Sequence, residues 1–166
     1  YFNNLKGLYL SYNNLSNINF LEKGNFYKLK ELYLEYNKIE DIKIFEKLKC
    51  EKLEKLCLSH NQITDISILK DLNLQKLKAL YLSDNQISDI DILQNVNFDN
   101  LEELNLSYNK ISDIKVLKNV KFKNLIMLDL KGNEELNFNQ LKNLIFKELK
   151  QLNLSNCGIN DLTFLE

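Results

Sequence analysis

The sequence predicts an α/β solenoid: a right-handed arc with a parallel β-sheet on its concave face and short helical or 3-10 segments on its convex face. Three observations predict it. Leucine recurs in three columns at a spacing of 24 residues, asparagine or cysteine follows each set, and apolar residues three positions apart occupy the second half of the units. Such periodicity indicates a repeat architecture, in which each unit buries its apolar face against its neighbours.

The leucine columns divide a single domain, residues 1–166, into about seven units. Within each unit apolar and polar residues alternate, as around Leu80 and Leu82, which is the period of a half-buried strand. One strand cannot bury its own face, so successive strands should pair in parallel, about 4.8 Å apart. The seventh unit is short, and we expect the chain to be a segment of a longer protein. The units begin near residues 5, 29, 53, 77, 101, 125 and 149.

The second half of each unit should return over the back of the sheet. Ile87, Ile90 and Leu93 are three residues apart, a spacing typical of a 3-10 or short α segment. The sixth unit departs from this pattern, because Glu135 stands where other units have isoleucine, so its back should be irregular. A further column is predicted to form a buried spine: Phe26, Cys50, Leu74, Phe98, Phe122 and Phe146.

An asparagine column is predicted to form a structural ladder. The chain leaves the sheet at these positions, and an inward amide can both donate to and accept from backbone groups that no strand pairs. An aspartate column, exemplified by Asp65 and Asp89, should cap the helical turns that follow. The ladder consists of Asn13, Asn37, Asn61, Asn85, Asn109, Asn133 and, in the seventh slot, Cys157.

These units read Leu-x-x-Leu-x-Leu-x-x-Asn/Cys, and over residues 5–165 the chain resembles the leucine-rich repeat family. The second half, Asn-x-Ile-[Ser/Thr]-Asp-Ile-x-x-Leu, as in Asn85 to Leu93, is similar to the subclass of protein phosphatase 1 regulators and bacterial internalins. The resemblance implies a non-enzymatic scaffold that binds a protein partner on the concave face.

Two polar columns should line that face, and six of the eight tyrosines fall in them. Tyrosine is favoured at interfaces because it offers apolar area and a polar tip. The alternative is that copied units simply inherit tyrosine, which also pairs well across strands. The candidate partner-binding residues are Tyr9, Tyr12, Tyr33, Tyr36, Cys57, His60, Tyr81, Asp84 and Tyr108.

Composition and motifs exclude several classes of function. The net charge of −1, with lysines and acids interspersed, argues against a nucleic-acid or membrane surface. No apolar run approaches the roughly 18 residues of a membrane span. No phosphate-binding glycine loop or metal-ligand motif occurs, so no cofactor or metal is expected. Cys57 and the single histidine, His60, lack an oxyanion motif, so no catalytic role is predicted.

Three settings remain open for such a scaffold, which we expect to be a monomeric module. The three cysteines have separate structural explanations, which favours a cytoplasmic or nuclear adaptor or regulatory subunit. An extracellular adhesin or receptor ectodomain of internalin type is an alternative. The repeats could also be the substrate-binding arm of a larger kinase or ubiquitin ligase. The partner and the biological process are not encoded in any motif.

Overall fold

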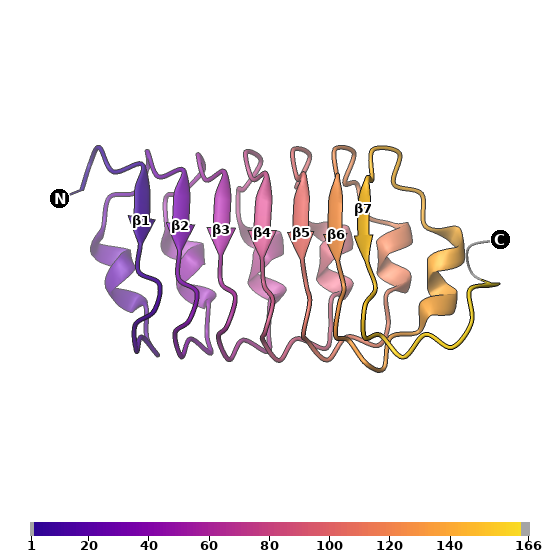
Figure 1. Cartoon of the computed structure of the whole chain (residues 1–166). Helices are drawn as coiled ribbons and strands as arrows, with labels where there is room; N and C mark the ends of the chain where they lie inside the picture. Colours follow the sequence, from indigo (N-terminus) through magenta and orange to yellow (C-terminus); the bar gives the residue numbers. More distant parts are fainter. Residues whose placement is uncertain (1, 164–166) are drawn as a thin grey trace.

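The computed structural model describes residues 2–163, which form a solenoid with its two ends at opposite extremes of the stack (Figure 1). Residue 1 and residues 164–166 of the predicted domain lie outside the described residues. The strands are Gly7–Tyr9 (β1), Glu31–Tyr33 (β2), Lys55–Cys57 (β3), Ala79–Tyr81 (β4), Glu103–Asn105 (β5), Met127–Asp129 (β6) and Gln151–Asn153 (β7). The 3-10 helices are Asn19–Lys23 (η1), Lys43–Lys47 (η2), Ser67–Asp71 (η3), Asp91–Asn95 (η4), Lys115–Lys118 (η5) and Phe138–Asn143 (η6).

The strands form one parallel sheet in chain order, β1 to β7. Leu8 pairs with Leu32 and Leu32 with Leu56, so the register is one repeat unit at each step. The predicted α/β arc, with its parallel sheet and short 3-10 segments, is confirmed. Each strand is only three residues long, because the chain must turn back over the apolar interior within the same unit.

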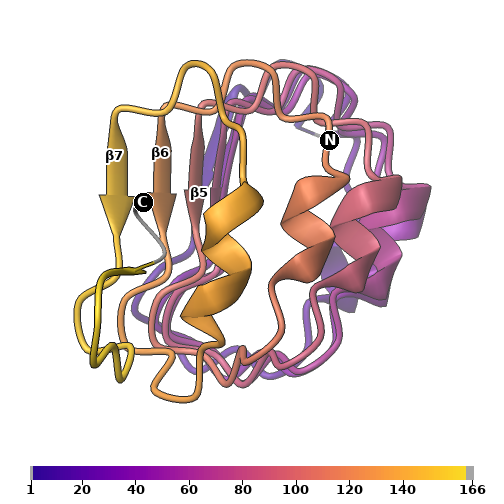
Figure 2. The same cartoon turned by 90° about the vertical axis from the view of Figure 1, so that its right-hand side faces the viewer.

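The core lies between the sheet and the row of 3-10 helices, seen end-on in Figure 2. Leu80 and Leu82 from the sheet side and Ile87 from the return segment are all 0% exposed. Phe98, in the predicted spine, is 2% exposed, and its ring centroid lies 6.2 Å from that of Phe122. The space between the sheet and the 3-10 helices is therefore filled by apolar side chains, and stacking supplies the burial that no single unit could achieve.

The sixth unit is irregular, as predicted. Glu135, which stands where the regular units have a buried isoleucine, is exposed. The next residue, Leu136, is buried instead. The amide of Asn137 donates to Ser112 O at 2.8 Å, an inter-unit bond made at a shifted position. Figure 2 shows η6 out of line with the other 3-10 helices. Ile145, just beyond η6, is 82% exposed, so this coil closes its back less completely.

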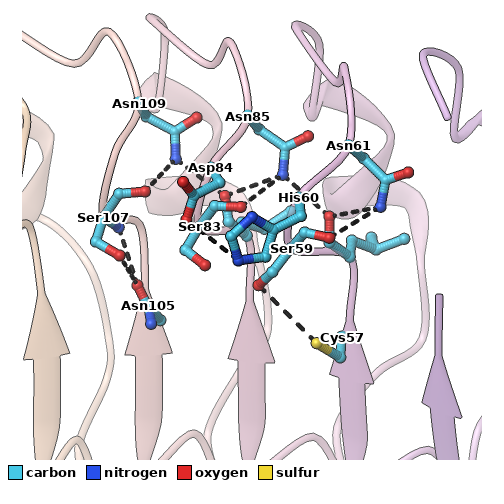
Figure 3. A network of polar contacts seen from close by, with 12 residues as sticks. Cys57, Ser59, His60, Asn61, Ser83, Asp84, Asn85, Asn105, Ser107 and Asn109 are labelled. Atoms are coloured by element: carbon cyan, nitrogen blue, oxygen red, sulfur yellow. Dashed lines mark hydrogen bonds and ion pairs between the residues drawn. The ribbon is translucent and has the colours of Figure 1, made fainter. Parts of the chain in front are cut away.

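The asparagine column joins adjacent units through the backbone. Asn85 Nδ2 donates to Leu58 O of the preceding unit at 3.0 Å, and to Leu82 O and Ser83 O of its own unit, both at 3.1 Å. Its Oδ1 accepts the amide of Ile63 at 2.9 Å. These bonds satisfy backbone groups left unpaired where the chain leaves the sheet (Figure 3). The same arrangement holds at Asn37, Asn61, Asn109 and Asn133.

The two ends of the ladder differ from its middle. Asn13 is exposed and donates within its own unit, to Leu10 O at 3.0 Å and Ser11 O at 3.2 Å. Cys157 is buried, and its thiol lies 3.2 Å from Leu130 O of the preceding unit. A thiol in this slot can donate weakly, as the asparagine NH2 group does. It has no oxygen that could accept a backbone amide as the asparagine side chain does.

The aspartate column meets the first amide of the following 3-10 helix. Asp65 Oδ1 accepts from the amide of Ser67 at 2.8 Å, with Ile66 standing between them at the N-cap. That backbone bond, aided by the Ser67 hydroxyl, holds the pKa of the Asp65 carboxyl below its usual value. Because the folded pKa is depressed, this stabilisation is complete above the unfolded pKa and is lost as the pH falls through the folded one.

We therefore expect Asp65→Ala to lower the free energy of unfolding at pH 7 by about 1 kcal/mol, the usual value of such a cap. The difference from wild type should shrink as the pH is lowered from about 5 toward 2, because the wild-type carboxylate then protonates. Urea unfolding at a series of pH values measures both quantities. Asp71→Ala, an exposed change at the other end of η3, is the control. A pH-independent difference would contradict the cap.

Candidate functional site

Just past each strand the chain turns through a residue with left-handed backbone geometry. Tyr12, Tyr36 and Tyr108 have φ values of 56°, 55° and 51°. Non-glycine residues adopt this region at a cost of order 1 kcal/mol or more, so a tyrosine here is an expensive choice. The same column continues through His60 (53°), Asp84 (52°), Gly132 (72°) and Asn156 (56°).

The left-handed turn stacks the first three side chains of this column into a ladder of rings. The Tyr12 and Tyr36 ring centroids are 4.2 Å apart and nearly parallel, at 10°. Tyr36 and His60 continue the stack at 3.9 Å and 13°. Tyr12 is 74% exposed and Tyr36 is 41% exposed. Exposure to solvent is therefore greatest at the Tyr12 end of the three-ring stack.

The second tyrosine column lies on the outward face of the sheet. The Tyr9 and Tyr33 ring centroids are 5.2 Å apart, and Tyr9 is 63% exposed. The hydroxyl of Tyr9 donates to Glu31 on β2, and that of Tyr81 donates to Glu103 on β5. Both hydroxyls are thus tied to the next strand, which fixes the rings on the sheet. Burial and the bond to Glu103 raise the pKa of Tyr81, so its phenol remains protonated.

We call the tyrosines of these two columns the tyrosine face: Tyr9, Tyr12, Tyr33, Tyr36, Tyr81 and Tyr108. Its exposed part is concentrated in the first two units, where Tyr9, Tyr12 and Tyr36 lie. Tyr81 is half-buried, and Tyr108 is 43% exposed. The sequence predicts these six residues in two columns. The sheet register places residues of one column on adjacent strands side by side, as at Tyr9 and Tyr33.

Cys57, one of the predicted partner-binding residues, contributes little to this exposed surface. It faces outward on β3 between Tyr33 and Tyr81 of the neighbouring strands, and is only 8% exposed because its short side chain lies below the larger ones. Burial raises the pKa of the Cys57 thiol to about 11. Its Sγ lies 3.9 Å from Ser59 Oγ (Figure 3), and a thiol held protonated is a poor nucleophile.

The middle of the left-handed column is polar. His60 Nε2 lies 3.5 Å from Asp84 Oδ2, so the ring stack ends on a carboxylate (Figure 3). Further along, the Lys131 ammonium lies 5.2 Å from the centroid of the Tyr108 ring. The same ring covers Gly132, where an added Cβ would come within 2.5 Å of it. Other units hold side chains in the same left-handed geometry, so the position of the Tyr108 ring is what leaves no room for a side chain at Gly132.

No candidate cofactor or metal site accompanies the tyrosine face. Within residues 2–163, no group of three or more histidine, cysteine or acidic side chains is placed to hold a metal ion. The side chains that the chain brings together there can stack, donate and accept hydrogen bonds, and carry charge. These are the means by which a surface recognises another macromolecule.

Models of known families identify the repeat. A model of leucine-rich repeats in two copies matches residues 3–49 and 51–95, and a second leucine-rich repeat model matches residues 75–134. The chain belongs to the leucine-rich repeat family. No curated protein sequence matches it significantly. The family fold is commonly a protein-interaction module, and its members are generally non-enzymatic binding scaffolds.

Solved leucine-rich repeat structures include close matches to this solenoid. An internalin from Listeria monocytogenes is 33% identical with a TM-score of 0.78, over 98% of this chain and 45% of that one. Internalin C2 from the same species is 28% identical with a TM-score of 0.80, over 98% and 67%. A leucine-rich repeat protein of Leptospira interrogans is 27% identical with a TM-score of 0.71, over 93% and 44%. The chain thus spans about half to two thirds of these proteins.

Sequence reasoning missed the left-handed turn of the leucine-rich repeat. The signal was present, because Gly132 and Asn156 stand in the same column as the tyrosines, and glycine and asparagine are the residues that favour this geometry. It also missed Glu35, which interrupts a column of serines between the two tyrosine columns.

Among the described residues, the helices are all too short or too polar to span a membrane.

Proposed function

We propose that this leucine-rich repeat chain is a non-enzymatic module that binds a partner protein through the tyrosine face on the concave side of the arc. One observation carries the proposal. The left-handed column holds tyrosines in a costly backbone conformation while leaving their rings in solvent, 74% exposed at Tyr12. Strained positions are retained where the surrounding structure has a use for them.

Energetics favour the same surface. Rigid, stacked tyrosines lose little conformational freedom on binding, so more of their contact energy appears as affinity. The hydroxyls of Tyr9 and Tyr81 are already fixed by Glu31 and Glu103, which orders the rings in advance. If the tyrosines had been copied between units only because they pair well across strands, they would be expected within the strands. The stacked rings of Tyr12 and Tyr36 lie beyond the strands.

The test replaces three exposed tyrosines by asparagine: Tyr9→Asn, Tyr12→Asn and Tyr36→Asn. Asparagine occurs at the corresponding positions of the seventh unit, Asn153 and Asn156, so the fold should be kept. A partner is identified by affinity capture and mass spectrometry, then purified and titrated by calorimetry. We expect binding to weaken by at least about thirtyfold, since aromatic anchors contribute about 2 kcal/mol or more.

The control is Tyr27→Asn, which removes a tyrosine that is 39% exposed and lies outside both columns. It should leave affinity within about twofold of wild type, a change below 0.5 kcal/mol. Equal melting temperatures of wild type and both variants establish that the fold is intact. If the triple variant binds the purified partner as tightly as wild type does, the tyrosine face is not the binding surface.

For the compartment we propose the cytoplasm or nucleus, where a regulatory subunit or adaptor would act. The support is that all three cysteines are free and buried, which is usual where thiols stay reduced. The second candidate is an extracellular adhesin, since two of the similar structures are internalins. The full-length reading frame distinguishes them: a secretory leader favours the adhesin, and an adjoining catalytic domain favours the substrate-binding arm of an enzyme.

A further inference from the structure

Glu35 has a carboxylate oxygen that the rest of the protein leaves unpaired. Its Oε2 is shielded from solvent and has no hydrogen-bond partner among residues 2–163. Serine occupies the equivalent position in most other units, as at Ser11 and Ser59. Burying a carboxylate oxygen without a donor costs free energy, so such a group calls for a physical explanation.

The surroundings of this carboxylate are aromatic. Glu35 follows β2 between Tyr33 and Tyr36, one from each column of the tyrosine face. Burial raises the pKa values of both tyrosines, and the Glu35 carboxylate is among the smaller causes of the same rise. Burial raises the pKa of the Cys57 thiol to about 11, and the charge of Glu35 and its interaction with that thiol are smaller causes of the rise. The Glu35 side chain is therefore a near neighbour of Tyr33, Tyr36 and Cys57.

The charge around the site is negative. The outward columns of the sheet and its left-handed edge carry five carboxylates against two lysines, whereas the whole chain has a net charge of only −1. An acidic face attracts basic partners and repels acidic ones. The carboxylates are Glu31, Glu35, Asp84, Glu103 and Asp129, and the lysines are Lys55 and Lys131.

The protein already places one cation against this face. Lys131 occupies the same column as Glu35, four units further along, and its ammonium lies over the Tyr108 ring. The attraction between a cation and the face of an aromatic ring is therefore in use at this surface. At Glu35 the same column supplies the opposite charge next to Tyr33, while Lys55 on β3 lies in register with Glu31 and acts on the pKa of Tyr33 against the effect of burial.

We infer that Glu35 and the Tyr33 ring accept an arginine side chain from the partner protein, beside the stack in which Tyr12 and His60 cover the two faces of the Tyr36 ring. A guanidinium donates N–H groups to a carboxylate and can pack against an aromatic ring, which accounts for both groups of the site. A quaternary ammonium could lie on the rings but has no N–H for Oε2. The inference rests on the proposed function, because it gives the chemistry of the residue that the tyrosine face receives.

Access does not require a change of fold. The Glu35 side chain as a whole is half-buried, and the neighbouring Tyr12 and Tyr36 rings are substantially exposed. Side chains of this kind change rotamer rapidly compared with binding. A guanidinium can thus reach the carboxylate while the strands and the asparagine ladder stay in place.

The experiment titrates the protein with Nα-acetylarginine amide and follows the tyrosine ring resonances by NMR. Two probes serve as comparisons: Nα-acetylcitrulline amide, which is neutral but of similar shape, and tetramethylammonium, a cation without N–H groups. We expect saturable shifts at Tyr33 and Tyr36 with the arginine probe, and binding at least about tenfold weaker with either of the others, since a charge-assisted hydrogen bond is lost.

Two variants locate the effect. Glu35→Ser installs the residue that the column uses elsewhere and should weaken the arginine probe by about tenfold or more. Glu51→Gln, which removes an exposed carboxylate outside the outward columns, should leave it within about twofold. The inference is overturned if arginine and citrulline bind alike, if Glu35→Ser binds the arginine probe as wild type does, or if no shift saturates, which would indicate that water alone satisfies Oε2.

The outcomes separate this inference from the proposed function. Loss of the partner in the triple tyrosine variant, without binding of the arginine probe, would uphold the tyrosine face and refute the arginine site. Undiminished partner binding by that variant, with a Glu35-dependent arginine site, would refute the tyrosine face as the partner surface and retain the site for a basic ligand.

Discussion

Phe98→Ala should lower the free energy of unfolding by about 3–5 kcal/mol, the largest stability effect we expect from a single change in this chain. Phe98 is 2% exposed and packs in the spine column beside Phe122 and Leu74. Removing the ring deletes buried apolar surface and leaves a cavity that neighbouring units, fixed by the sheet register, cannot collapse to fill. Chemical unfolding followed by circular dichroism measures the loss.

Phe98→Leu provides the matched control and guards against a variant too unstable to study. Leucine already stands in the spine at Leu74, which is 1% exposed. We expect this change to cost no more than about 1.5 kcal/mol, because most of the volume is retained. Equal losses for the alanine and leucine variants would mean that the spine does not carry the packing attributed to it.

Asn85→Ala should cost about 1–3 kcal/mol. The side chain makes three donations and one acceptance in the buried ladder, and alanine leaves the amide of Ile63 without that partner. The carbonyls of Leu58 and Leu82 keep the bonds donated by Asn61 and Asn109, so the desolvation penalty of the orphaned Ile63 amide is the main cost. Urea unfolding at neutral pH gives the value directly.

Asn13→Ala is the matched control, because Asn13 is exposed and donates only within its own unit. We expect its cost to stay below about 1 kcal/mol, in the range of surface substitutions. If the two variants lost equal stability, the bonds between units would not be the source of the effect. Asn85→Asp adds a second check, since a carboxylate can accept from Ile63 but cannot donate to the carbonyls.

The fold could be read from the sequence because a 24-residue period fixes three things together. It sets which leucines face inward, which strands pair, and where the asparagine leaves the sheet, as Leu80, Leu104 and Asn85 illustrate. Repeats reduce a global packing problem to one unit and its neighbour. The irregular sixth unit was also predictable, since Glu135 cannot replace a buried isoleucine without cost.

The candidate site was harder to read, because its features depend on relations between columns. Alternation predicted that Cys57 faces outward, which it does, but its burial arises from the larger tyrosines on both neighbouring strands. Glu35 stood out only as an interruption among serines, and its unpaired oxygen requires the positions of the surrounding rings. Sequence specifies the columns, while the depth of each side chain within them follows from its neighbours.

The ladder has a consequence for how such a chain changes over generations. Each asparagine bonds only to its own unit and the one before it, and each strand keeps the same register with the next. Duplicating or deleting one whole regular unit in the gene, among those with an asparagine in the ladder, therefore leaves the neighbouring junctions chemically complete. A duplicated second unit would bring its own Tyr33, Glu35 and Tyr36, so recognition surface could be lengthened by copying, before any substitution refines it.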